Sequence, residues 1–555
     1  MCHPFLPTVF LLVLPIAYFA NRIGALRSAA LRWTIGGLLT GVAALEFPFS
    51  GLGEPYVAYL KMLISVSMAA WTVVRGRGFD GQALERRTRA LVVGMAMASV
   101  CVSWDFFAFH GNHALIHYPE FTHYYLGSKY FPELGYGSLY TAMLEAEQES
   151  TGALSVEEAR DLSTNHVVPA SDLLTRAGAV KARFTPDRWS QFSKDAEFFR
   201  RNLGPLYATA VTDHGFNPSP VWALFGGAIA NLVPATSIGV HLLANLDFLL
   251  EAVALGAIAA TFGVELALVA VVYFCVIYGA SFDWLGGAYL RYMWFCSLVL
   301  AACALKLGCK GLAGSLLALA TMLRVFPGFF AVGIAFKALG FPGRQSSERA
   351  AYVRFIVAFA STALGLFVLT LASGEGMTAW IDFVRNVSTH SQSLSSNFVG
   401  LTNPVLYSLR AIGVIPEDVS SFLEWRRRIT LIQVMALLPL GVALIWRARE
   451  RLDDVSALAV GGLLMVIAVN LAAYYCSFLV VVMLSRRRNP VHVAMMFFAE
   501  FVTYFMQLFE KHPVVLFWYR GAILFYLLSA VFCDDLRPPP KGGRVDPTLV
   551  TETAR

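Results

Sequence analysis

Residues 351–372 read AYVRFIVAFASTALGLFVLTLA, and Arg354 is the only charged side chain in this run. An α-helix needs about 20 mainly apolar residues to cross the hydrocarbon core of a bilayer, so the run predicts a membrane-spanning helix. Similar runs recur along the chain, at 5–20, 33–50, 56–74, 89–104, 219–234, 237–260, 264–282, 288–305, 311–339, 429–446, 455–484, 490–508 and 514–533. The sequence therefore predicts an all-α polytopic membrane protein with about 13–15 transmembrane helices.

The composition agrees with this class. Of the 555 residues, 57% are hydrophobic and 14% are charged, whereas soluble domains carry about 25% charged residues. No positive charge precedes Arg22, so the first run lacks the basic region of a cleavable signal peptide and is predicted to be a span. The net charge of +6 resides in short loops between spans, which indicates membrane lipids and no nucleic acid as partners.

The basic residues predict the topology, because excess Lys and Arg mark cytoplasmic loops. They gather at 22–32, 75–89, 337–354, 447–451 and 486–488, and in the tail 534–555. The long segment 106–218 then faces the extracytoplasmic side, where its thirteen acidic residues exceed its nine basic ones, and segment 374–427 lies on the same side. We divide the chain into three N-terminal spans with a basic loop (1–88), a membrane catalytic region (89–533) and a cytoplasmic polar tail (534–555).

Two apolar runs are too long for one regular span. Simple alternation gives five crossings between 218 and 340, which would leave Lys306 and Lys310 outside. A second solution folds 311–339 as a short up-and-down pair broken near Pro327, which cannot donate a helical hydrogen bond, with an earlier segment re-entrant. Likewise, two short helices meeting near 470–475 would return the arginines at 486–488 to the cytoplasm. Broken helices at membrane depth must be buried in protein or line a cavity, so both breaks predict one site near the outer face.

Two charged residues within apolar surroundings are candidates for chemistry. Asp105 stands where an apolar helix enters segment 106–218, and low-dielectric surroundings can raise a carboxyl pKa toward that of a general base; alternatively, it only caps the helix end. Arg324 is alone in an apolar run, and an intramembrane arginine is a functional hypothesis because its burial is costly. A guanidinium fits phosphate oxygens; the alternative is that Arg324 reaches an interface.

Further polar candidates lie in the segments between spans. Asp213, His214 and Asn217 lie among a glycine and prolines where segment 106–218 returns to the membrane, which predicts a non-helical polar turn. His390 and Asn397, with Asn386 and Asn403, form a neutral hydrogen-bonding group that suits a hydroxyl-rich ligand or an ordinary loop. Of the histidines at 110, 113, 117 and 123, the first three have spacings of three and four, which would place them near one another on a helix; no cysteine joins them, and we predict no metal.

The segment EFTHYYLGSKYFPELGY, residues 120–136, holds four tyrosines, a lysine and two glutamates. Tyrosine and phenylalanine are typical of the membrane–water interface. We expect an aromatic belt at headgroup depth, with Lys129 and the glutamates turned to water.

In organisation, residues from about 90 to 533 resemble the GT-C superfamily of integral-membrane glycosyltransferases. The features that carry the resemblance are an aspartate at the end of a span, a long exported loop with amphipathic helices, a proline-rich re-entry and a late broken helix. Within the superfamily, the chain is most similar to the family 87, polyprenyl-phosphate-mannose-dependent bacterial enzymes. It differs in having three spans before the helix that ends at Asp105, and in lacking a second acid beside that residue.

The resemblance implies roles for particular residues. Asp105 would be the base that deprotonates an acceptor hydroxyl, and Arg324 would hold the donor phosphate. Tyr474 and Tyr475 would match the double-tyrosine helix start of such enzymes. In segment 120–136, the tyrosines would stack on sugar faces and Lys129 would meet a lipid phosphate; the predicted substrate contacts there are Tyr124, Lys129, Tyr130, Glu133 and Tyr136.

We therefore expect an inverting transfer of a hexose such as mannose from a polyprenyl-phosphate donor to a lipid or glycan acceptor. It would take place on the extracytoplasmic face of a bacterial inner membrane, without a cofactor. A transporter or flippase of a lipid-linked substrate is a rival hypothesis, but it predicts internal repeats and the sequence has none. A ligase or polymerase that uses a lipid diphosphate is a second rival, in which His214 or His390 would act with Arg324.

Overall fold

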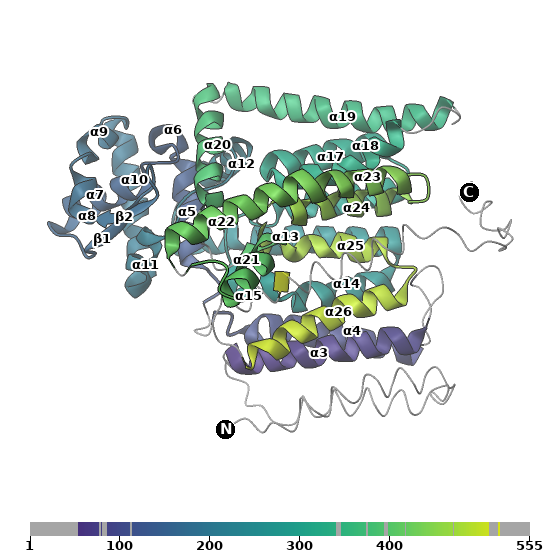
Figure 1. Cartoon of the computed structure of the whole chain (residues 1–555). Helices are drawn as coiled ribbons and strands as arrows, with labels where there is room; N and C mark the ends of the chain where they lie inside the picture. The colour runs from purple at the N-terminus through teal and green to yellow at the C-terminus, as the bar shows by residue number, and fades with distance from the viewer. Residues whose placement is uncertain are drawn as a thin grey trace, which may run out of the picture.

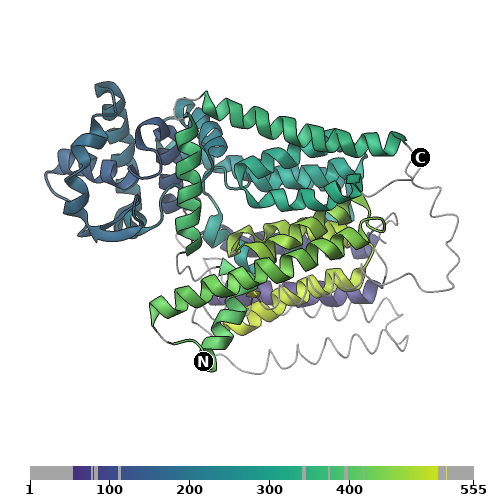
Figure 2. The same cartoon turned by 45° about the horizontal axis from the view of Figure 1, so that its top comes forward.

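The computed structural model describes residues 54–76, 79, 86–110, 114–339, 346–372, 376–392, 398–416, 418–469, 471–509 and 520–521. The predicted spans 5–20 and 33–50, most of 514–533 and the tail 534–555 lie outside these residues. The chain is mostly helical, with roughly parallel long helices and a smaller group of short helices beyond one end of them (Figures 1 and 2).

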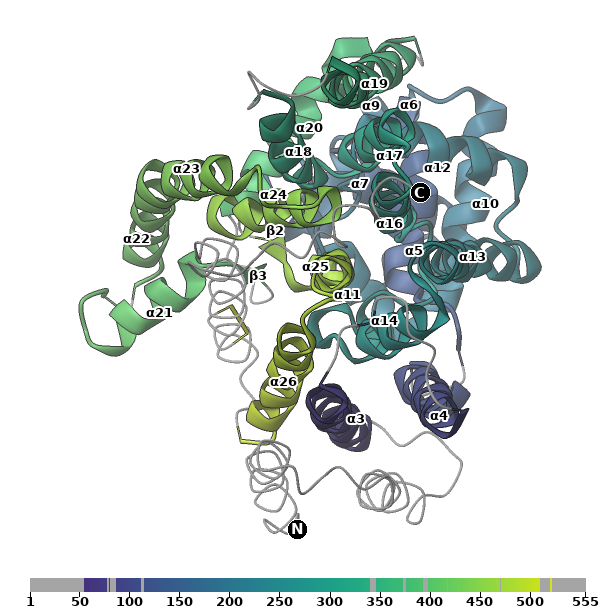
Figure 3. The same cartoon turned by 90° about the vertical axis from the view of Figure 1, so that its right-hand side faces the viewer.

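The long helices form a bundle. Its elements are α3 (Glu54–Arg75), α4 (Arg86–Ser103), α12 (Pro220–Leu232), α13 (Ser237–Phe262), α14 (Val264–Val276), α16 (Met293–Lys306), α17 (Lys310–Leu323), α18 (Ala331–Leu339), α19 (Ser346–Leu371), α22 (Val419–Ile432), a π-helical turn η6 (Gln433–Leu437), α23 (Leu438–Ala448), α24 (Asp454–Ala468), α25 (Leu479–Ser485) and α26 (Pro490–Gln507). Seen end-on, α25 lies near the middle, with α3, α4 and α26 on one side and α17 and α19 on the other (Figure 3).

Among the described residues, four helices are long and apolar enough to cross a membrane: Pro55–Arg75, Ser237–Phe262, Ser347–Leu371 and Val419–Ala448. On α19, Val357, Leu364 and Val368 expose 59%, 62% and 54% of their surface. A row of exposed aliphatic side chains along one helix indicates contact with lipid or another protein. The coarse prediction of an α-helical membrane protein agrees with these helices.

Basic residues from distant parts of the chain meet at one end of the bundle, which we call the basic end. Arg75 is 2.6 Å from Glu265 at the start of α14, and the nearby end of α13 places Phe262 under the Arg487 guanidinium. Arg487 is also 3.2 Å from Asp453. The next residue, Asp454, lies 2.9 Å from both Lys310 and Lys337. This gathering of basic loops is what the positive-inside tendency predicts.

The same contacts decide between the two predicted topologies. Lys310 begins α17 and Lys337 lies near the end of α18, yet both contact Asp454. The chain therefore goes out along α17, turns at Arg324 and η5 (Phe326–Phe330), and returns along α18, so the predicted up-and-down pair with its break at Pro327 is confirmed. α24 and α25 form a second such pair, because Ser456 Oγ lies 3.5 Å from the Ser485 carbonyl oxygen.

Segment 219–234 is not a regular span. α12 has 13 residues, a length of about 20 Å at 1.5 Å per residue, and it packs beside α5 (Tyr118–Lys129). Gly226 and Gly227 permit this approach, because a Cβ at Gly227 would lie 2.6 Å from the Ser128 carbonyl oxygen. α12 therefore fits the predicted re-entrant segment.

The smaller group of helices comprises most of segment 106–218. Its elements are η2 (Asp105–Phe107), α5, α6 (Phe131–Leu134), α7 (Leu139–Thr151), β1 (Glu158–Asp161), β2 (His166–Pro169), α8 (Ala170–Leu174), α9 (Ala177–Lys181), α10 (Pro186–Leu203), η3 (Gly204–Leu206) and α11 (Tyr207–Thr212). β1 and β2 are antiparallel, with Glu158 opposite Pro169. α10 begins at a Thr185 N-cap and buries Trp189, Phe192 and Phe199. The predicted amphipathic helices are thus present, and Figure 1 places them opposite the basic end.

The remaining elements connect the bundle helices at the end opposite the basic end. They are η4 (Tyr278–Ala280), α15 (Phe282–Leu285), α20 (Gly376–Gln392), β3 (Phe398–Val399), α21 (Thr402–Ala411), β4 (Leu471–Ala472) and η7 (Ala473–Phe478). β3 pairs with β4, with Phe398 opposite Ala472. This short pairing ties segment 374–427 to the break between α24 and α25.

Candidate functional site

The two broken helices meet, as the sequence predicts. Arg324 ends α17 in an extended backbone conformation, and its Cζ lies 5.8 Å from the centroid of the Tyr475 ring in η7. The Phe326 and Tyr475 rings are 4.8 Å apart, and Trp294 contacts both rings. The breaks in two hairpins therefore form one aromatic-lined place away from the basic end.

A second arginine joins this place. Arg324 Nη2 donates a hydrogen bond to the Tyr124 hydroxyl at 2.9 Å, and Arg291 Nη1 contacts the same hydroxyl. Arg291 Nη1 is also 3.4 Å from Glu120 Oε2. The Arg291 guanidinium lies 4.7 Å from the Tyr124 ring centroid and 4.9 Å from that of Tyr474. We call Glu120, Tyr124, Arg291, Arg324, Tyr474 and Tyr475 the arginine cluster.

The charges of the arginine cluster are not balanced within it. Arg291 and Arg324 are 4% and 8% exposed, and Glu120 is the one carboxylate of the cluster. Within the described part of the chain, Arg324 makes no ion pair and its Nε has no hydrogen-bond partner. Buried polar groups are nearly always satisfied, and a planar guanidinium pairs well with phosphate or carboxylate oxygens. The cluster is therefore suited to binding an anion.

Asp105 lies in a cavity of about 810 Å³, within the range of about 300–1,000 Å³ typical of small-ligand sites. The walls come from α3, residues 105–110 and 114–119, η3, segment 278–284 and the end of α26. The polar lining residues include Lys61, Asp105, His110, His117, Asn202, Asp283 and Gln507. Among the described residues, Arg324, His214 and Tyr474 do not line this cavity. The predicted base and the predicted phosphate ligand thus occupy two compartments.

The backbone around Asp105 is strained. Asp105, Phe106, Phe107 and Phe109 have φ values of 44°, 52°, 69° and 52°. Non-glycine residues rarely adopt positive φ, and such strain persists only where the surroundings enforce it, often at functional sites. Here it turns the chain sharply at the end of α4 and places a buried carboxylate, 5% exposed, at the cavity wall.

The cavity and the arginine cluster border the same helix start. His117 and Tyr118 line the cavity, while Glu120 and Tyr124, about one and two turns further along α5, belong to the cluster. His117 Nδ1 accepts a hydrogen bond of 3.4 Å from the Glu120 amide and caps α5. Burial lowers the pKa of His117 to about 4, so this imidazole is neutral at pH 7 and keeps its acceptor nitrogen. The first turns of α5 are therefore the wall between the two compartments.

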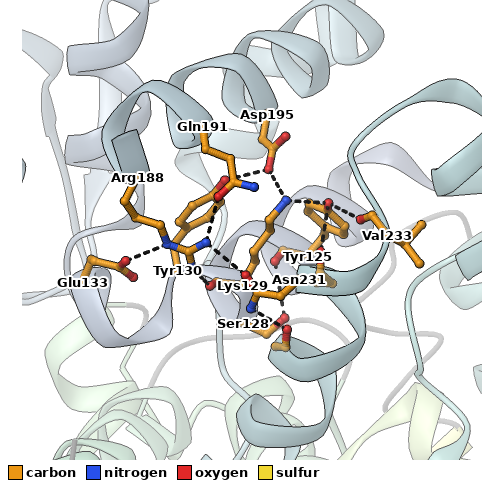
Figure 4. A network of polar contacts seen from close by, with 12 residues as sticks. Tyr125, Ser128, Lys129, Tyr130, Glu133, Arg188, Gln191, Asp195, Asn231 and Val233 are labelled. Carbon is orange, nitrogen blue, oxygen red and sulfur yellow. Dashed lines mark hydrogen bonds and ion pairs between the residues drawn. The ribbon is translucent and has the colours of Figure 1, made fainter. Parts of the chain in front are cut away.

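Segment 120–136 is not an exposed aromatic belt, and the prediction that Lys129 faces water is wrong. The Lys129 ammonium is 2.7 Å from Asp195 Oδ2 and donates to the Tyr125 hydroxyl at 3.0 Å, with its side chain 2% exposed (Figure 4). Tyr130 donates to the same carboxylate oxygen at 2.7 Å. The partner residue lies on α10, distant in sequence, so only packing reveals that Lys129 is neutralised.

The other glutamate of that segment is also paired. Glu133 Oε1 accepts a hydrogen bond of 2.8 Å from Arg188 Nε (Figure 4). Tyr136 is buried and donates to the Pro218 carbonyl oxygen at 2.8 Å. Of the predicted contacts in this segment, Tyr124 belongs to the arginine cluster. Lys129 and Tyr130 connect the end of α5 to α10, and Glu133 connects α6 to α10.

The predicted polar turn is split between different neighbours. Asp213 Oδ2 is 3.8 Å from His123 Nδ1, and the Asp213 side chain is half exposed. His214 Nδ1 is 2.9 Å from Asn165 Oδ1. Asn217 Oδ1 accepts a hydrogen bond of 3.1 Å from Asn386 Nδ2 on α20, so of these residues Asn217 joins the two segments that lie between spans.

Two further predicted residues are described in part or not at all. His390 lies on α20, but its side chain, like the whole of Asn397, lies outside the described residues. Within the described ranges, no group of three His, Cys, Asp or Glu side chains is placed to hold a metal ion, although the rings of His110 and His117 lie 5.1 Å apart.

Sequence reasoning missed Arg291, Glu120 and Lys61. Arg291 follows GGAYL near the start of the predicted span 288–305, and the sequence signal is an arginine inside an apolar run. Lys61 lies within a predicted span, where a buried charge is a functional hypothesis; its Nζ donates to Ser281 Oγ at 2.7 Å beside the cavity. α3 therefore helps to form the cavity.

Comparisons with known proteins give no family for this chain. No protein-family model, no curated protein and no solved structure matches it.

Proposed function

We propose that this protein is a membrane glycosyltransferase that moves a sugar, such as a hexose, from a polyprenyl-phosphate donor to an acceptor hydroxyl. The observation that carries the proposal is the Arg324 guanidinium at the meeting point of two broken helices. It is buried, cationic and, among the described residues, without a carboxylate partner. We propose a lipid phosphate as the anion, because a ligand that enters this site from the bilayer carries its negative charge on a phosphate.

The place of the arginine cluster agrees with a lipid-linked donor. It lies at the breaks of the hairpins, opposite the basic end, which the positive-inside tendency assigns to the cytoplasm. The proposed reaction is therefore extracytoplasmic. Tyr474 and Tyr475 are partly exposed beside the two arginines, and aromatic faces suit a prenyl chain or a sugar ring.

The chemistry is an inverting displacement. Asp105 accepts the proton of the acceptor hydroxyl in the cavity. The hydroxyl oxygen forms the new bond to the anomeric carbon of a donor sugar that must extend past the first turns of α5, because these turns separate the cavity from the arginine cluster. The bond from that carbon to the phosphate oxygen breaks, and the lipid phosphate leaves with the electron pair. Arg291 and Arg324 offset the charge that develops on the phosphate, and fixed donors in a water-poor site are effective at this task.

The test is sugar transfer from a radiolabelled polyprenyl-phosphate hexose by the full-length protein in lipid nanodiscs, with glycan and lipid acceptors supplied. Asp105→Asn should lower transfer by about 10²–10⁴-fold, the usual contribution of a general base, and Arg324→Ala by about 10²–10³-fold. Matched controls are Asp382→Asn and Arg385→Ala, which remove an exposed ion pair on α20 and should leave transfer unchanged.

Two results would contradict the proposal. Full transfer by Asp105→Asn would remove the assigned base. Movement of the labelled lipid across proteoliposome membranes, without formation of a glycosylated product, would show a transporter.

A further inference from the structure

We infer that Asp247 on α13 is a positioning residue that holds the backbone of Arg291, so that its guanidinium reaches the arginine cluster. The inference rests on the proposed function, because it concerns the site assigned to the donor phosphate. It adds a residue that does not contact the phosphate and that the sequence patterns did not indicate.

The contacts of Asp247 are specific. Its Oδ2 accepts a hydrogen bond of 2.9 Å from the Arg291 amide, and its Oδ1 accepts one of 3.0 Å from the Tyr292 amide. The side chain is buried, at 4% exposure. A buried carboxylate is costly unless it is hydrogen-bonded, and here two consecutive backbone amides take up both of its oxygens. Asp247 thus fixes the backbone on both sides of the Arg291 carbonyl.

The segment that carries Arg291 is strained. Leu290, the preceding residue, has a φ of 52°, which a branched side chain rarely adopts. Such a conformation persists only where neighbours enforce it, and it is often found where a side chain must be aimed. The backbone must therefore be held both before and after Leu290, and Asp247 holds it after Leu290, at the amides of residues 291 and 292.

Other elements hold the segment at residues 287, 289 and 290. The Leu290 carbonyl oxygen accepts a hydrogen bond of 3.2 Å from Trp222 Nε1, and the Tyr289 hydroxyl donates to the Gly226 carbonyl oxygen at 2.7 Å. Gly287 has a φ of 68°, and a Cβ there would lie 1.7 Å from the Leu115 carbonyl oxygen. Segment 286–292 is therefore held from α12, from residue 115 and from α13, and removal of Asp247 frees the end that bears Arg291.

Arg324 provides an internal comparison. It is at the end of α17, and its position depends on the break before η5, not on segment 286–292. Loss of Asp247 should therefore act through Arg291 and leave the position of Arg324 unchanged. Energies of residues that act through one another, or that share a partner, are not additive, and Arg291 and Arg324 share the Tyr124 hydroxyl.

The experiment is a pair of double-mutant cycles on the full-length protein in nanodiscs, with binding of sugar-free polyprenyl monophosphate as the readout. We expect Asp247→Ala and Arg291→Ala each to weaken binding by about tenfold or more, the usual effect of losing hydrogen bonds to a charged group. The Asp247/Arg291 double variant should be no weaker than Arg291→Ala alone. In the second cycle, Asp247→Ala should couple to Arg324→Ala to the same extent as Arg291→Ala does.

Controls separate positioning from folding. Asn245→Ala removes an exposed polar side chain from the same helix and should leave binding unchanged. Asp247→Asn retains one carbonyl acceptor, so it should lose less affinity than Asp247→Ala. If Asp247→Ala does not fold, Asp247→Asn replaces it in both cycles. Hydrogen exchange should rise at 290–292 and not in α17.

The outcomes are distinguishable. If the wild-type protein does not bind polyprenyl monophosphate, the proposed function fails. If it binds, but the losses from Asp247 and Arg291 substitutions multiply, the positioning role of Asp247 fails while the donor site stands.

Discussion

Replacement of Asp195 by Leu should loosen the attachment of α10 to α5. The Lys129 ammonium lies 2.7 Å from Asp195 Oδ2, with side-chain exposures of 2% and 10%. Removal of one partner of a buried ion pair costs about 3–5 kcal/mol, because the remaining charge is left without compensation. Lys129 would keep the Tyr125 hydroxyl at 3.0 Å, so we expect the lower end, about 3 kcal/mol.

Hydrogen exchange of the α10 amides measures this opening directly, because protection reports local unfolding free energies. A loss of about 3 kcal/mol corresponds to roughly a 100-fold rise in the open population, at 1.4 kcal/mol for each factor of ten. The matched control on the same helix is Glu197→Leu, which breaks two ion pairs within α10, with Arg200 and Arg201, whose side chains are 23% and 74% exposed. That change should cost about 1 kcal/mol or less.

A double variant tests the physical cause. Lys129→Met combined with Asp195→Leu removes both charges, and replacement of a buried pair by apolar residues is often close to neutral, so protection should return toward wild type. If the double variant exchanges as fast as Asp195→Leu, lost packing and not an uncompensated charge explains the effect. If Lys129→Met abolishes sugar transfer while protection and folding are intact, the interpretation of Lys129 as a structural residue is refuted.

Two further predictions concern other parts of the molecule. Asp454→Asn leaves Lys310 and Lys337 beside each other without their shared carboxylate, so thermal denaturation in detergent should show a loss of about 3 kcal/mol; denaturation at the wild-type temperature would contradict it. His117 has a pKa of about 4 in the folded protein because it is buried, against about 6.5 when unfolded. Between pH 6.5 and pH 4 the unfolded chain binds the extra proton, so stability falls as pH falls through this window. His117→Asn keeps an N-cap for the Glu120 amide and should flatten that part of the stability profile; an unchanged pH dependence would show that another group titrates.

Much of the fold follows from the sequence because its cause is local. The length of run 351–372 predicted α19, and the proline in 323–327 predicted the break after α17. The arginines at 486–488 predicted the return of the chain along α25. Each prediction depends on a property of one segment: its apolar length, a missing amide donor or a charge that stays out of lipid.

The candidate site follows from the sequence only in part. Arg324 and the pair Tyr474–Tyr475 were predicted, and the structure brings them together because two broken helices must bury their free backbone groups against one another. Asp105 was predicted as well, but it lies in a separate cavity with Lys61. Segment 120–136 was assigned to the membrane surface, because nothing in its own residues shows that Asp195 compensates Lys129.

The sequence alone therefore determined that this chain is helical, that its basic loops share one end, and that two of its helices are interrupted. Tertiary structure decided which charges meet. Lys129 and Asp195 are 66 residues apart in the chain, and Arg291 reaches Tyr124 from 167 residues away. Helix formation and partition into lipid depend on neighbouring residues, whereas the pairing of buried charges depends on which helices pack together. That packing leaves Arg324 without a carboxylate partner among the described residues, and the proposed function depends on this arginine.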